Sequence, residues 1–174
     1  MICPPLYTEQ RQRGSVAIEF AAIFLLFFTL VYGAIAYGIP AMIQLSFQHL
    51  TAEASRAALK VDPDQSSSSF VSLVSQEVSA TITASWLPEA WRTSCSAPDD
   101  GGTWEALPSV EGGTSYGYIQ TESLYDYTRY QLYVCIQTQD SIVPQLILGD
   151  IRLPDLPKDS SGTPVIRAST LSYL

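Results

Sequence analysis

The sequence predicts an α+β fold, in which a long N-terminal transmembrane and amphipathic helix packs on a small, mostly antiparallel sheet domain. The first observation is a run of twenty residues without a charge, 20–39. As a helix with a rise of about 1.5 Å per residue, it would extend about 30 Å, enough to cross a bilayer. The second is that apolar side chains recur at helical spacing between residues 43 and 57. The third is the alternation of residues 128–138, which is typical of a strand.

Charged residues around the apolar run predict how it crosses the membrane. Arg11 and Arg13 precede it, whereas seven basic and fifteen acidic side chains follow it. Because basic flanks stay in the cytoplasm, we expect a cytoplasmic N-terminus and an extracytoplasmic C-terminal domain. Glu19 lies just inside the apolar segment, where an unpaired carboxylate costs up to about 3 kcal/mol. We therefore expect either a partner charge or a side chain that extends to the headgroups.

A secretion signal is the alternative interpretation of this segment. The small residues Ala34 and Ala36 would then direct cleavage after Ala36. However, the apolar run before Ala34 is longer than the roughly 7 to 15 residues of such signals, and export alone gives no role to Glu19. These two features favour a retained membrane helix.

A stalk helix is predicted directly after the span. Gly38 and Pro40 predict a kink, because proline removes a backbone donor and clashes with the preceding turn. Asp62 and Pro63 predict the end of the helix. The residues of its apolar stripe are Ile43, Phe47, Leu50, Ala54 and Ala57. We expect this stripe to pack inside the chain's own core, with a contact between subunits as the alternative.

The remaining residues, 62–174, suffice for one compact domain. A polar stretch at 66–69 precedes a short amphipathic helix from Phe70, and residues 78–86 alternate like a strand. Residues 96–117 predict a surface loop that Trp104 pins to the domain. The further predicted elements are strands at 128–138, 150–153 and 165–173, and an apolar patch at 142–148 that Pro144 interrupts.

Composition excludes several classes of function. His49 is the only histidine, and the chain contains no P-loop, glycine-rich dinucleotide fingerprint or C-x-x-C pair. We therefore expect no catalytic residue, cofactor or small-molecule substrate. The turn at residues 99–102 has two aspartates but lacks the spaced ligands of a calcium loop, so we expect no metal site, with calcium as the alternative. A net charge of −8 argues against nucleic-acid binding and leaves proteins and the membrane as partners.

The start of the apolar run resembles a known processing site. A leader ends in Gly14, the five residues from Ser15 to Glu19 follow, and Phe20 opens the run. This arrangement is similar to the processing site of type IV prepilins, especially the Flp or type IVb branch. The following residues, including an alanine-rich segment that carries Arg56, resemble the TadE-like (TadE/TadF) family of minor pilins and pseudopilins. The resemblance covers residues 11–60.

This resemblance implies how the chain is processed and divided. A prepilin peptidase would cleave between Gly14 and Ser15. The result would be a leader, 1–14, a transmembrane and stalk helix, 15–61, and an exported domain of pilin-like fold, 62–174. Glu19 and Phe20 would serve assembly. In stacked subunits, Glu19 of one chain would meet the N-terminal amine of Ser15 in a neighbour, which turns a buried charge into a pair that sets the axial register.

The resemblance also implies a non-enzymatic role as a minor pilin or pseudopilin in the biogenesis of a Flp/type IVb tight-adherence pilus. Its partners would be the prepilin peptidase, TadF-like and Flp-like pilins, the pilus assembly platform and the membrane. We expect a single-pass protein of the inner membrane with a periplasmic domain, and incorporation into the extracellular pilus stays open. A TadF-type subunit is a second assignment. The alternative of another class is an unprocessed single-pass protein with an extracytoplasmic binding domain.

The three cysteines fit this topology. Cys95 and Cys135 follow the span, and a pair of cysteines in an oxidising compartment predicts one disulfide. Cys3 belongs to the leader and would remain a thiol. If the topology were reversed, Cys95 and Cys135 would be two separate buried thiols.

Overall fold

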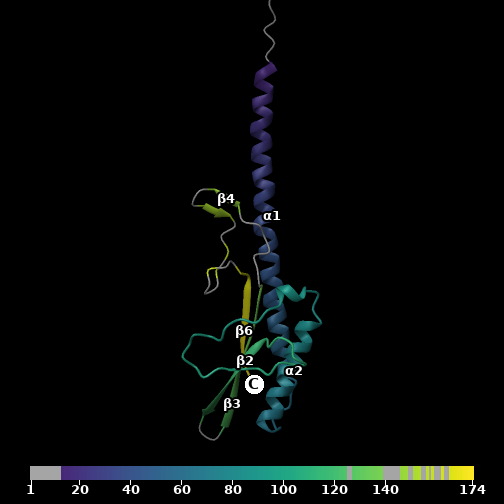
Figure 1. Ribbon diagram of the computed structural model, residues 1–174, viewed down its shortest axis with the longest axis vertical. Coiled ribbons are helices and arrows are strands. Elements are labelled where there is room, and N and C mark those ends of the chain that lie inside the picture. The colour runs from purple at the N-terminus through teal and green to yellow at the C-terminus, as the bar shows by residue number, and fades with distance from the viewer. Residues whose placement is uncertain are drawn as a thin grey trace, which may run out of the picture.

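The computed structural model describes residues 13–124, 127–138, 146–148, 151–153, 156, 158, 162 and 165–174. The C-terminal half of a long helix packs against a second helix and a sheet, and its N-terminal half projects beyond them (Figure 1). This arrangement is the predicted α+β fold. The elements are α1 (Arg13–Ala58), α2 (Ser67–Thr83), a 3₁₀ turn η1 (Glu89–Trp91), β1 (Glu105–Ala106), β2 (Gly117–Leu124), β3 (Tyr127–Gln137), β4 (Leu146–Leu148), β5 (Ile151–Leu153) and β6 (Arg167–Tyr173).

Helix α1 is one continuous element of 46 residues that contains Pro40. With a rise of about 1.5 Å per residue, it is about 69 Å long. The predicted kink region at Gly38 and Pro40 therefore does not end the helix. A turn follows Ala58, in which the Lys60 N–H donates to the carbonyl of Ala57 at 3.1 Å.

The apolar stripe of α1 packs inside the chain, as predicted. All five of its residues are buried: Ile43, Phe47, Leu50, Ala54 and Ala57. All but Ala57 belong to one core cluster with residues of α2, β2, β3 and β6. The core therefore lies between the lower half of α1, α2 and one face of the sheet.

Helix α2 corrects one prediction. It extends to Thr83, so the strand predicted at residues 78–86 is wrong. Apolar and polar residues do alternate in this segment, but the large buried side chains recur every four residues: Phe70, Val74, Val78 and Ile82. Both periods contain Val78 and Ile82, and packing against α1 selects the helical one.

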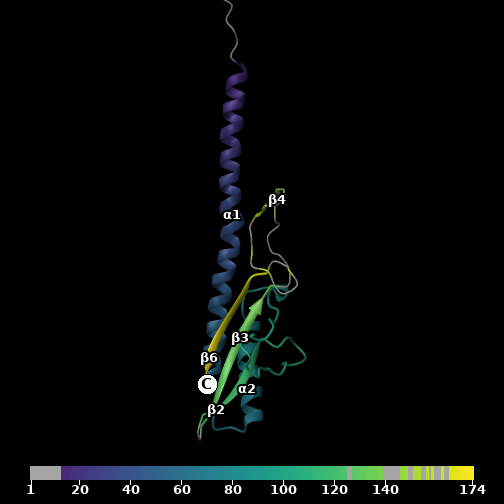
Figure 2. The same cartoon turned by 90° about the vertical axis from the view of Figure 1, so that its left-hand side faces the viewer.

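The main sheet has the strand order β1-β2-β3-β6, with every neighbouring pair antiparallel. Its longest strand, β3, confirms the strand predicted at 128–138 within one residue at each end. Leu132, Val134 and Ile136 face the helices, whereas Tyr133 and Cys135 form a second cluster on the other face. Figure 2 shows β3 and β6 beside the lower part of α1.

The other strands were predicted less well. The strand predicted at 165–173 appears as β6, which begins two residues later at Arg167. The strand predicted at 150–153 is observed as β5 and pairs with β4 from the apolar patch at 142–148. Residues 142–145 and 150 lie outside the described residues. β2 was not predicted, because its residues 120–123 are all polar, and β1 lies inside the predicted loop.

Candidate functional site

The N-terminal part of α1 presents apolar side chains in all directions. No described side chain between residues 16 and 35 is buried, and Ala36 is the first that is. The large exposed side chains are Val16, Ile18, Phe20, Ile23, Phe24, Leu25, Leu26, Phe27, Phe28, Leu30, Val31 and Ile35. A helix that is apolar on every side requires a bilayer or other helices around it. Among the described residues, α1 is the one helix that is long and apolar enough to cross a membrane.

The predicted processing and assembly residues lie in the first turns of this segment. Gly14 and Ser15 are the second and third residues of α1, whose described start is Arg13. Glu19 and Phe20 follow one turn later, and both side chains are exposed. The ring of Phe20 begins a row with Phe24 and Phe28, in which successive ring centroids are 6.2 and 6.3 Å apart. Glu19 is thus the one acidic side chain within a long, exposed apolar surface.

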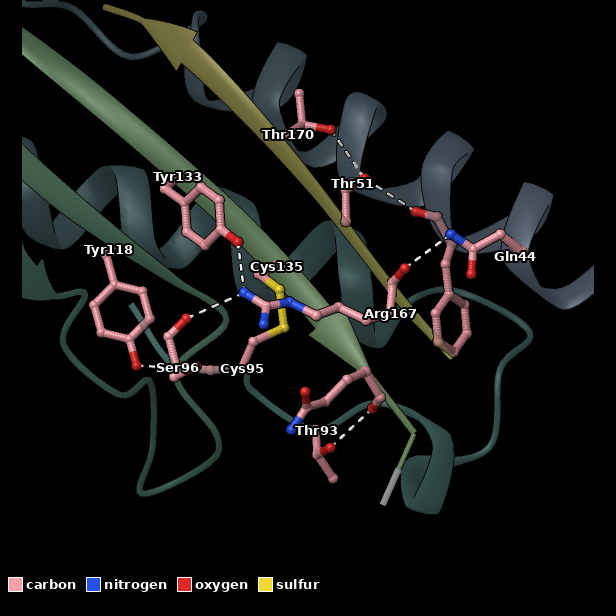
Figure 3. The surroundings of a disulfide bond; sticks show 12 residues. Gln44, Thr51, Thr93, Cys95, Ser96, Tyr118, Tyr133, Cys135, Arg167 and Thr170 are labelled. Carbon is pink, nitrogen blue, oxygen red and sulfur yellow. Dashed lines mark hydrogen bonds between the residues drawn. A yellow bond between two sulfur atoms is a disulfide. The ribbon is translucent and has the colours of Figure 1, made fainter. Parts of the chain in front are cut away.

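Polar contacts fix the lower part of α1 to strand β6. The Gln44 side-chain amide donates to the Arg167 carbonyl at 2.8 Å. Further along α1, the Thr51 hydroxyl accepts a hydrogen bond of 3.0 Å from the Thr170 hydroxyl of β6 (Figure 3). Strand β6 therefore runs beside α1, away from the exposed part of the helix. The sequence analysis missed these contacts, because each joins residues more than a hundred positions apart.

Cys95 and Cys135 are joined by a disulfide, the pair expected from the sequence. Their Cα atoms are 5.8 Å apart, and both residues are buried. The bond ties the loop before β1 to the middle of the sheet, on the face opposite the helices (Figure 3). The predicted disulfide and the predicted assembly residues therefore lie in different parts of the molecule and do not meet.

Hydrogen bonds hold the same loop beside the disulfide. The Arg167 guanidinium donates to the Tyr133 hydroxyl at 2.8 Å and to the Ser96 carbonyl at 3.4 Å (Figure 3). The Tyr118 hydroxyl donates to the Cys95 carbonyl at 2.8 Å. Thr93 and Gln137 exchange backbone hydrogen bonds of 3.0 and 2.9 Å. The outer face of the sheet is therefore covered by a loop that is anchored at several points.

The aspartate turn of this loop has a structural explanation. Asp100 Oδ1 accepts hydrogen bonds from the Trp104 indole at 2.8 Å and from the Gly102 N–H at 2.9 Å. These two contacts, the indole first, hold the pKa of Asp100 below its usual value of 3.8. Trp104 also packs on Tyr133, with ring centroids 5.9 Å apart, as expected for a residue that pins the loop. Within the described part of the chain, no three His, Cys, Asp or Glu residues gather where they could hold a metal ion.

His49 is a surface residue of α1. Its side chain is 74 % exposed, and its Nδ1 atom lies 3.8 Å from a carboxylate oxygen of Glu53. Both residues line a hollow of about 720 Å³ between α1 and the end of α2.

One catalytic spacing was overlooked in the sequence. Residues 113–117 read G-T-S-Y-G, the spacing of a nucleophile elbow. An elbow places its serine between a strand and a helix, whereas Ser115 lies directly before β2. Gly117 is needed for packing, because a Cβ there would lie 2.7 Å from the Tyr133 carbonyl oxygen. Gly113 closes a turn through its N–H to the Val110 carbonyl at 2.9 Å, so the motif is explained by the fold.

A comparison with known proteins finds a family match that lies within helix α1. Residues 14–56 match the family model of TadE-like proteins. No curated protein and no solved structure matches the chain. The matched range begins at Gly14, contains Glu19 and ends at Arg56, so it confirms the resemblance that these residues predict. Over residues 14–56 the chain is therefore similar to TadE-like proteins, a family associated with the tight-adherence (Tad) pilus.

Proposed function

We propose that this chain is a minor pilin or pseudopilin in the biogenesis of a Flp/type IVb tight-adherence pilus. In this proposal a prepilin peptidase removes residues 1–14, and the mature chain is assembled through its N-terminal helix. The observation that carries the proposal is the exposed apolar surface of residues 16–35, within a segment that matches the TadE-like family from Gly14 onward. The role is non-enzymatic.

The disulfide supports an extracytoplasmic location for the C-terminal domain. A disulfide persists in oxidising compartments and is rare in the cytoplasm. The bond between Cys95 and Cys135 therefore agrees with the topology that Arg11 and Arg13 predict for the span. We place the N-terminus in the cytoplasm, the single span in the inner membrane and the domain in the periplasm, from which the chain can enter the extracellular pilus.

Glu19 gives the helix a means to specify assembly. Four helical residues separate it from Ser15, a distance of about 6 Å along the axis. After leader removal, Ser15 carries an amine, and the carboxylate of a neighbouring chain can pair with it inside an apolar bundle. Removing one partner of a buried pair costs about 3 to 5 kcal/mol, because the other charge is left uncompensated. The expected partners are TadF-like and Flp-like pilins and the assembly platform.

Replacement of Gly14 tests processing. We expect Gly14→Ala to retain the leader, because the peptidase requires glycine before the scissile bond. Gly33→Ala is a matched control in the same helix, since a Cβ at Gly33 meets no atom within 4 Å. Intact mass of the membrane-extracted protein distinguishes precursor from mature chain. Loss of the leader from the Gly14→Ala variant would contradict the proposed cleavage site.

Replacement of Glu19 tests assembly. Glu19→Ala should leave membrane insertion intact, since it removes a charge from the span, but should reduce incorporation into pili and capture of partner pilins. Thr29→Ala is the control, because the Thr29 hydroxyl donates to the Leu26 carbonyl of its own helix at 2.9 Å. Unchanged piliation and partner capture by the Glu19→Ala variant would refute the pairing. Retention of the leader together with normal capture would favour an unprocessed membrane-anchored binding protein.

A further inference from the structure

An exposed apolar surface continues from the span onto the domain. On α1, Met42 and Leu45 are 72 % and 65 % exposed. Together with Ile35 and Ile39, which are also exposed, they continue one face of the helix at spacings of three and four residues. Trp86, just after α2, is 72 % exposed and lines the same hollow as Leu45. We call Met42, Leu45 and Trp86 the collar.

The fold holds the collar at the end of the α1–α2 helix pair that is nearer the span, and the strand β4 lies still farther toward the N-terminal end of α1 (Figures 1 and 2). Phe70, near the start of α2, lies beside Ala58 at the lower end of α1. Thr81 and Ala84, at the other end of α2, line the hollow with Leu45. Helix α2 therefore runs back toward the span (Figure 1). This direction brings Trp86, just after the helix, to the same hollow as Leu45.

The expected depth of the collar matches the lipid interface. With residues 20–39 in the hydrocarbon core, Met42 and Leu45 follow about 4.5 and 9 Å further along the axis, in a stretch that stays uncharged as far as Glu53. The headgroup region extends about 5 to 8 Å beyond the hydrocarbon core on each side. Met42 thus lies within this region, and the side chains of Leu45 and Trp86 reach its outer boundary. Tryptophan is enriched at this level, because its ring is apolar and its N–H can donate.

We propose that the collar seats the domain on the outer surface of the bilayer, with Trp86 among the phospholipid headgroups. Continuity with the span favours lipid over a protein partner. The collar itself carries no charge, and the His49–Glu53 pair lies on the side of the hollow away from the span. Because the chain has a net charge of −8, the attraction is interfacial rather than electrostatic and should be insensitive to salt. The proposal requires membrane insertion but not leader removal.

Quenching by brominated phosphatidylcholine tests the collar in the full chain reconstituted into vesicles. In one variant, Trp91→Phe and Trp104→Phe leave Trp86 as the reporter. In a matched variant, Trp86→Phe and Trp91→Phe leave Trp104. Trp104 packs on Tyr133, whose partner on strand β6 is Leu171. Leu171 follows Thr170, which is hydrogen-bonded to Thr51 of α1, so Trp104 lies farther from the span than the collar does. Bromine near the lipid carbonyls should reduce Trp86 emission about twofold and leave Trp104 emission unchanged, in low and high salt.

Substitutions in the Trp86 reporter chain separate the collar from general contact with lipid. Met42→Ser combined with Leu45→Ser should reduce quenching, because the apolar surface that seats the domain is lost. Leu59→Ser is the control, since Leu59 is 57 % exposed but lies at the opposite end of the stalk. Equal quenching of both reporters, or none of Trp86, would overturn the proposal. A blue shift of Trp86 that appears only at high protein density, without quenching, would also overturn it, because a second copy would then cover the collar.

Each outcome is independent of the leader. The quenching experiment can be carried out with the Gly14→Ala variant as well as with the original chain. Failure of processing would therefore refute the proposed pilin maturation without affecting the collar, and absence of quenching would refute the collar without affecting the cleavage site.

Discussion

Removal of the disulfide between Cys95 and Cys135 should destabilise the C-terminal domain. The two cysteines are 40 positions apart. In the chain-entropy model, closing a loop of this length stabilises the folded state by about 4 kcal/mol at 25 °C. For a domain of this size, 1 kcal/mol corresponds to about 3 to 4 °C in the midpoint of thermal unfolding. We therefore expect the double variant Cys95→Ser, Cys135→Ser to unfold about 12 to 16 °C lower.

The structure locates most of this loss in the unfolded state. Without the disulfide, Thr93 still pairs with Gln137, and the Ser96 carbonyl still accepts from Arg167. The folded loop thus keeps other anchors, whereas the unfolded chain gains the freedom of the opened loop.

Near-ultraviolet circular dichroism of the detergent-solubilised full chain measures this transition with and without reductant. Cys3→Ser is the matched control, and we expect it to unfold at the original temperature in both conditions. A decrease of less than about 4 °C for the double variant would refute the loop-entropy reasoning. Alkylation of Cys95 or Cys135 in the folded, unreduced protein would refute the bond itself.

Two further predictions concern single polar groups. The Ser55 hydroxyl is buried without a hydrogen-bond partner, so Ser55→Ala should raise the free energy of unfolding by about 1 kcal/mol, and a lower thermal midpoint would contradict this expectation. Asp100 has a pKa held below its usual value by Trp104 and Gly102. The contribution of ionised Asp100 to the stability of the folded loop is therefore fully present above about pH 4, and it is lost as the pH falls through the lowered pKa. Fluorescence of a chain that retains only Trp104 should stay constant from pH 7 to 5 and change below pH 4, and Asp100→Asn should abolish the change.

Local periodicity explains which elements could be predicted. The stripe on α1 and the alternation of β3 each match one period, and each packs on one buried face. The segment around Val78 and Ile82 matches two periods, and only its contact with α1 decides between them. β2 has too few apolar residues to show a pattern, because its pairing with β3 provides the order that its own side chains do not. Tertiary contacts therefore decide the elements that the sequence leaves ambiguous.

The same distinction applies to the candidate site. Gly14, Ser15 and Glu19 form a local pattern whose spacing is visible in the chain, and the family match covers them. The contact of Gln44 with Arg167 joins residues 123 positions apart. The closeness of Trp86 to Leu45 likewise depends on the direction of α2. These features follow from the folded arrangement and have no local signal.

The N-terminus of the native protein tests the central claim most directly. Intact mass and peptide mapping would be carried out on protein extracted from its own membrane, with and without the cognate prepilin peptidase. We predict a chain that begins at Ser15 when the peptidase is present and retains residues 1–14 when it is absent. A Met1 terminus in both samples would contradict the proposed pilin function, and a chain that begins at Tyr37 would show that the N-terminal segment is a secretion signal.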